Sequence, residues 1–91
     1  MKNKIAIESL SMDLLRVALG YHKGSINKAS IFSEESLKRI SEIDKNSVKP
    51  YFASILEKIS SVLLGKNQKQ IAEDALMYST LCKNYSKKFL N

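Results

Sequence analysis

The sequence predicts an all-α protein, a small four-helix up-and-down bundle that we expect to pair as a homodimer. Glycines at 20, 24 and 65 and the single proline, Pro50, divide the 91 residues into four segments of helical length. Apolar residues recur in each segment at spacings of three and four, and no run alternates polar and apolar residues long enough to form a strand. Short connectors between such segments favour antiparallel neighbours.

The first segment, residues 3–22, predicts a helix with one continuous inner stripe. That stripe consists of Ile7, Leu10, Leu14, Val17 and Tyr21. Gly20 and Gly24 stand where such a helix would end, because glycine is the usual residue just past a helix C-terminus.

The second segment, residues 25–44, predicts a helix that begins after Ser25 as its N-cap. Its inward residues would be Ile26, Ala29, Phe32, Leu37, Ile40 and Ile43. The run Ser33, Glu34, Glu35 also looks like the start of a helix, so a break near Phe32 is an alternative to one continuous helix.

The third segment, residues 48–64, predicts a one-sided helix with Ser47 as its cap and Pro50 in its first turn, where a missing N–H costs nothing. Its stripe is formed by Val48, Phe52, Ile55, Ile59 and Val62, widened by Tyr51, Leu56 and Leu63. The fourth segment, residues 67–89, has the inner stripe Ile71, Ala75, Tyr78, Cys82, Tyr85 and Phe89.

Length and residue counts predict a single domain, residues 1–91, with a thin margin of stability. Cys82 is the only cysteine, so no disulfide within the chain can add stability, and one unpaired cysteine fits a reducing compartment. His22 is the only histidine, so we expect no metal site, and no motif calls for a cofactor. The remaining source of buried apolar surface is a partner chain.

The first segment carries a second apolar set that does not fit its inner stripe. This set comprises Ile5, Met12, Leu15 and Leu19, and Leu76 and Met77 fall outside the inner stripe of the last segment in a similar way. A helix that is apolar on two sides is usually buried on two sides. These six residues are therefore the predicted oligomer interface, most simply of a two-fold dimer. The alternative is a first helix that lies centrally, with the other three around it.

The net charge of +6 makes an anionic partner such as nucleic acid possible. Residues 46–91 hold seven bases and three acids, against eight and six in residues 1–45. The candidate nucleic-acid-binding residues are Lys66, Lys69, Lys83, Lys87 and Lys88. Compositional bias toward Lys, Asn, Ile and Ser would produce the same excess without any selection for binding, and we favour this explanation.

Arg16 and His22 are the candidate catalytic residues. Their Arg-x5-His spacing resembles the short motif of the HEPN family of small helical nucleases, in which the arginine and histidine act on an RNA phosphate. Six residues on a regular helix place the two side chains about 240° apart. The resemblance therefore implies a kink at Gly20 or pairing across a dimer.

Taken together, these patterns favour a non-enzymatic, self-associating helical module that presents a surface to a protein partner. A basic nucleic-acid-binding accessory protein and a small HEPN-like ribonuclease are the alternatives. Glu8, Asp13 and Arg16 interrupt the apolar run that a signal peptide needs, and no run approaches the ~20 apolar residues of a membrane span. We therefore expect a cytoplasmic protein without a membrane partner.

Overall fold

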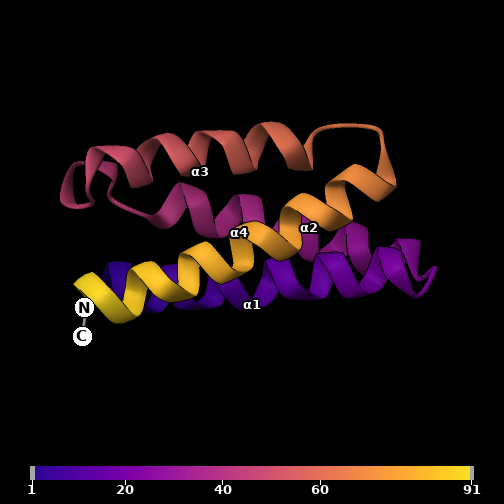
Figure 1. Ribbon diagram of the computed structural model, residues 1–91, viewed down its shortest axis with the longest axis horizontal. Helices are drawn as coiled ribbons and strands as arrows, with labels where there is room; N and C mark the ends of the chain where they lie inside the picture. The colour runs from indigo at the N-terminus through magenta and orange to yellow at the C-terminus, as the bar shows by residue number, and fades with distance from the viewer. Residues whose placement is uncertain (1, 91) are drawn as a thin grey trace.

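The computed structural model describes residues 2–90, which are all-helical and form a compact bundle (Figure 1). Four α-helices, α1 (Lys2–His22), α2 (Ile26–Glu42), α3 (Pro50–Leu63) and α4 (Gln68–Phe89), follow one another, with a short 3₁₀-helix, η1 (Lys45–Ser47), between α2 and α3. Consecutive helices run in opposite directions, so α1 begins at the end of the bundle where α4 finishes (Figure 1). The predicted helical bundle is confirmed.

α1 packs closely against α2 and α4, whereas α3 lies across α2 and α4 with fewer contacts. The close seams are built from small side chains. A Cβ atom added to Gly20 would lie 3.0 Å from the Cβ of Ala29, so the α1–α2 seam depends on the absence of a side chain there. On the other side of the core, larger side chains of α3 fill the space toward α1, and Phe52 and Leu56 are fully buried.

α2 is continuous through Phe32, and Ser25 occupies its N-cap position without a side-chain capping bond. The prediction that Ile26 faces inward is wrong, because this side chain is 47% exposed in the first turn. Ser33 and Ser36 are buried on α2 instead, and their hydroxyl groups have no hydrogen-bond partner. Serine does not contribute to an apolar pattern, so the helical periodicity could not predict that these two residues are buried.

The prediction that Ser47 caps the third helix is also wrong. Residues Lys45–Ser47 form η1, whose N-cap Asp44 accepts hydrogen bonds from the Asn46 N–H at 3.0 Å and the Ser47 hydroxyl at 2.8 Å. α3 begins later, with Lys49 as N-cap and Pro50 in the first turn as predicted. Pro50 marks the first turn of the helix correctly, but the residue that caps it lies directly before the proline, at Lys49.

The inner face of α3 is rotated slightly from the predicted stripe. Leu56 and Leu63 are buried, whereas Ile55 and Val62 are only partly buried. Tyr51 was predicted to widen the stripe and is 53% exposed. On α4, Phe89 is the last residue of the helix and is 38% exposed, although it was predicted to belong to the inner stripe. Within residues 2–90, no helix is both long enough and apolar enough to cross a membrane.

Candidate functional site

The outer face of α1 and the neighbouring side of α4 carry apolar side chains that the bundle leaves exposed. The exposed fractions of the six predicted interface residues lie between 40 and 66%. These residues are Ile5, Met12, Leu15 and Leu19 of α1 and Leu76 and Met77 of α4. The alternative in which the other three helices surround α1 is therefore wrong: α1 packs mainly on α2 and α4, and its far side stays open.

Three of these side chains follow a seven-residue repeat along α1. Ile5, Met12 and Leu19 are each seven residues apart, and Leu15 lies three residues after Met12. Two turns of helix take close to seven residues, so side chains at this spacing form one row along the helix. The row runs for about 21 Å, at 1.5 Å per residue over fourteen residues. Such a row is the pattern by which one helix packs along another.

Met12, Leu15 and Leu76 line one hollow between α1 and α4, with a volume of about 510 Å³. The hollow has a polar border of Glu8 and Ser11 from α1 and Ser79, Thr80, Lys83 and Lys87 from α4. It therefore combines an apolar centre with mostly basic charge at the end where α1 begins and α4 finishes.

Hydrogen bonds between α1 and α4 hold the two walls of this hollow together. The Ser11 hydroxyl donates to the Ser79 carbonyl at 2.8 Å, and the Ser79 hydroxyl donates to the Ser11 carbonyl at 2.7 Å. Nearer the ends of the helices, the Ser86 hydroxyl donates to the Glu8 carboxylate at 3.1 Å. The hollow is thus part of a fixed helix pair.

The other predicted interface residues lie around this hollow and do not line it. Ile5 lines a separate hollow with Arg39 and Glu42, on the α2 side of α1. Leu19 lines a third one at the α1–α2 turn. Met77 follows Leu76 and therefore points about 100° further around α4.

The structure places Arg16 and His22 in different hollows. Arg16 Nη1 lies 3.2 Å from Asp13 Oδ1, and its guanidinium lies over the Phe32 ring at 5.3 Å from the centroid. His22 lies beside Lys69 and Glu73 of α4, in a hollow that Arg16 does not line. α1 is helical through Gly20. Within one chain, the two residues of the Arg-x5-His motif do not converge on a common site.

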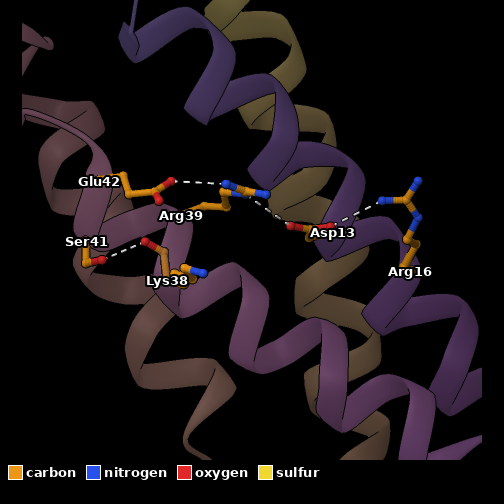
Figure 2. Close-up of polar contacts among 6 residues, drawn as sticks. All are labelled: Asp13, Arg16, Lys38, Arg39, Ser41 and Glu42. Atoms are coloured by element: carbon orange, nitrogen blue, oxygen red, sulfur yellow. Dashed lines mark hydrogen bonds and ion pairs between the residues drawn. The ribbon is translucent and has the colours of Figure 1, made fainter.

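Both arginines of the chain contact one buried carboxylate, that of Asp13 (Figure 2). Arg39 Nε lies 3.8 Å from Asp13 Oδ2 and makes no hydrogen bond, while Arg39 Nη1 binds Glu42 at 3.2 Å. Burial raises the pKa of Asp13 above its ordinary value of 3.8, and the hydrogen bond and charge of Arg16 only partly offset this. Asp13 therefore links α1 to α2 at an electrostatic cost.

Sequence reasoning missed this network. Asp13 stands three residues before Arg16, the spacing of a helical ion pair, and that signal was available. The sequence gives no corresponding signal for Arg39, because its approach to Asp13 depends on how α2 packs against α1. Ser41, which is drawn beside this network in Figure 2, donates to the Lys38 carbonyl at 2.6 Å and takes no part in it.

The five candidate nucleic-acid-binding lysines are exposed but do not form one patch. Lys66 lies in the connector before α4, and Lys69 lies in the hollow with His22. Lys83 and Lys87 border the α1–α4 hollow. Lys88 lies elsewhere, with its ammonium 5.4 Å from the centroid of the Phe89 ring.

The remaining chemically reactive group is the thiol of Cys82. It is fully buried on the inner face of α4, and burial raises its pKa to about 12. A thiol with so high a pKa is almost entirely protonated and a poor nucleophile at neutral pH. The described residues include no group of three or more histidine, cysteine or acidic side chains arranged to hold a metal ion.

No protein-family model matches the chain, and no curated protein and no solved structure matches it either.

Proposed function

We propose that this chain is a non-enzymatic helical module that pairs with a second copy of itself through the outer face of α1 and the adjoining side of α4. In the pair, the remaining faces of the two bundles are available to a protein partner. The observation that carries the proposal is the row of exposed apolar side chains, seven residues apart, on α1.

The energetics support a reversible pair. Complete burial of a large aliphatic side chain contributes roughly 1.5–3 kcal/mol, and these side chains are already about half covered, so each adds roughly 1 kcal/mol. Twelve side chains, six from each copy, together contribute about 12 kcal/mol. This gain falls within the roughly 4–15 kcal/mol that association costs. A dimer held by this face alone would therefore dissociate readily on dilution.

Charge favours an antiparallel arrangement of the two α1 helices. Lys83 and Lys87 lie beside the N-terminal half of α1, next to Glu8. A parallel pair would bring the lysines of both copies to the same end, where like charges repel. An antiparallel pair places them at opposite ends and brings Ile5 of one copy opposite Leu19 of the other, with Met12 near the two-fold axis.

The proposal is tested by measuring mass in solution by sedimentation velocity across a concentration series into the tens of micromolar. We expect the wild-type protein to shift from monomer to dimer, and Met12→Lys to remain monomeric because it places a charge in the middle of the apolar row. Ile31→Lys is the matched control, since Ile31 is 57% exposed on α2, away from the proposed interface.

Circular dichroism should show equal helical content for both variants. A wild-type protein that stays monomeric throughout the series would overturn the proposal. So would an Ile31→Lys variant that dissociates the pair as strongly as Met12→Lys.

A further inference from the structure

Where α3 begins, four aromatic rings gather against the end of α4. The innermost two, Phe52 and Tyr85, are buried and stacked, with centroids 4.0 Å apart and planes 11° apart. The Tyr85 hydroxyl accepts a hydrogen bond from the Lys49 N–H at 2.9 Å, so the ring is fixed at both ends. These two rings form a rigid base.

The outer two rings, Tyr51 and Phe89, rest on this base and face solvent. Tyr51 lies 6.0 Å from Tyr85 and Phe89 lies 4.9 Å from it, measured between ring centroids. Their planes are inclined at 62° to one another. Tyr51 is 53% exposed, so much of its ring remains available for contact in the folded protein.

Two lysines are held beside these rings. The ammonium groups of Lys49 and Lys88 lie over the Phe89 ring, 5.3 and 5.4 Å from its centroid. Among residues 2–90, neither lysine forms an ion pair with a carboxylate, so their charges are not neutralised locally. The arrangement places two positive charges over Phe89, next to the exposed ring of Tyr51.

We propose that Tyr51 and Phe89, with Lys49 and Lys88, form a binding site for single-stranded nucleic acid. An unpaired base would stack on the Tyr51 ring, and the two ammonium groups would bind the flanking phosphates. Exposed rings combined with cations are the features by which proteins bind single strands without sequence preference. A duplex is a poor ligand for this site, because its base faces are already stacked on one another.

This site is separate from the self-association surface. Its residues belong to the start of α3 and the last turn of α4, whereas the self-association surface is formed by α1 and, on α4, by Leu76 and Met77, which lie more than ten residues earlier in that helix. Either proposal can therefore fail without affecting the other. A pair of bundles would carry two such sites, which would raise the apparent affinity for a long strand.

The first experiment measures binding of labelled oligo(dT) and oligo(U) by fluorescence anisotropy at low salt. We expect Tyr51→Leu to weaken binding roughly tenfold, the effect of losing one stacked base, and Tyr51→Phe to bind as the wild type does. The chain has no tryptophan, so its tyrosine emission is visible. Stacking should quench part of that emission in the wild-type protein but not in Tyr51→Phe.

The second experiment repeats the titration over a salt series with the double variant Lys49→Gln/Lys88→Gln. Loss of two phosphate contacts should make the slope of log K against log salt shallower by about 1.4. The control is Lys28→Gln/Lys38→Gln, which removes the same charge from exposed positions on α2 and should leave the slope near that of the wild type.

Comparing the two oligonucleotides distinguishes DNA from RNA as the preferred strand. The proposal is overturned if neither strand binds at low salt, if a duplex competes as well as a single strand, or if Tyr51→Leu binds as tightly as the wild type. Circular dichroism of each variant checks that the bundle is intact.

Discussion

Ser11 and Ser79 exchange hydrogen bonds across the α1–α4 seam, each hydroxyl donating to the backbone carbonyl of the other residue at 2.8 and 2.7 Å. Both carbonyls already belong to helices, so the serines use the second acceptor position of each oxygen. Both side chains are buried, and their small size lets the two helices approach closely. The pair therefore fixes the spacing and the relative position of the first and last helices.

We expect Ser79→Ala to lower the free energy of unfolding by about 1 kcal/mol, because it removes one buried hydrogen bond while Ser11 still has its carbonyl acceptor. Ser79→Val should cost more, since its larger side chain forces the helices apart. Urea denaturation followed by circular dichroism measures both. Thr80→Ala, at an exposed position one residue along α4, is the control. Equal stability of Ser79→Ala and the wild type would show that the exchanged bonds contribute nothing.

The raised pKa of Asp13 predicts an unusual pH dependence of stability. A folded-state pKa above the ordinary value of 3.8 means that the folded protein binds this proton more tightly than the unfolded chain does. The contribution of Asp13 to stability therefore rises as the pH falls through the raised pKa, and it levels off below the ordinary value. At neutral pH, the ionised carboxylate contributes less to stability than the protonated one does.

The measurement compares the free energy of unfolding of the wild type with that of Asp13→Asn, from neutral pH down to about pH 4. We expect the wild type to gain stability relative to the variant as the pH falls. For Ser54→Ala, which removes no titratable group from an exposed position on α3, the corresponding difference should stay constant over this range. A wild type that loses stability relative to Asp13→Asn on acidification would show that the arginines dominate over burial.

The antiparallel pairing of α1 predicts which cysteine variants cross-link. Near the two-fold axis, Met12→Cys should form a disulfide between copies on mild oxidation. Leu19→Cys should not, because an antiparallel pair separates the two copies of this position by about 21 Å along the helix. The native Cys82 can remain in place, since it is buried and its pKa is raised to about 12. Non-reducing gel electrophoresis gives the result, and cross-linking of Leu19→Cys as efficiently as Met12→Cys would indicate a parallel pair.

Much of the fold could be predicted from the sequence because helical period and chain punctuation are local signals. The stripe from Ile7 to Tyr21 and the position of Pro50 depend only on neighbouring residues. The burial of Ser33 and Ser36 could not be predicted in this way, because a small polar side chain is buried only when another helix approaches closely. The slight rotation of α3, which buries Leu56 in preference to Ile55, is likewise set by packing.

The candidate surface also has one part that could be predicted from the sequence and another that depends on packing. The exposed row on α1 followed from helical geometry, because Met12 and Leu19 lie away from the inner stripe whatever α1 packs against. The hollow between α1 and α4 could not be predicted in this way, because its two walls come from residues more than sixty positions apart. Ser11 and Ser79, for example, are 68 residues apart. The Tyr51 and Phe89 cluster is also a product of tertiary packing, because it joins the start of one helix to the end of another.

The seam between α1 and α4 has a consequence for the order in which the chain folds. As the polypeptide leaves the ribosome, α1 and α2 can associate early, but the side of α1 that contacts α4 has no cover until the last helix has been synthesised. The hydrogen bond between Glu8 and Ser86 spans 78 residues, so it forms only after the end of α4 has emerged. The nascent first helix therefore exposes this apolar side until α4 docks, and the α1–α4 side of the core is the last part of the bundle to be covered.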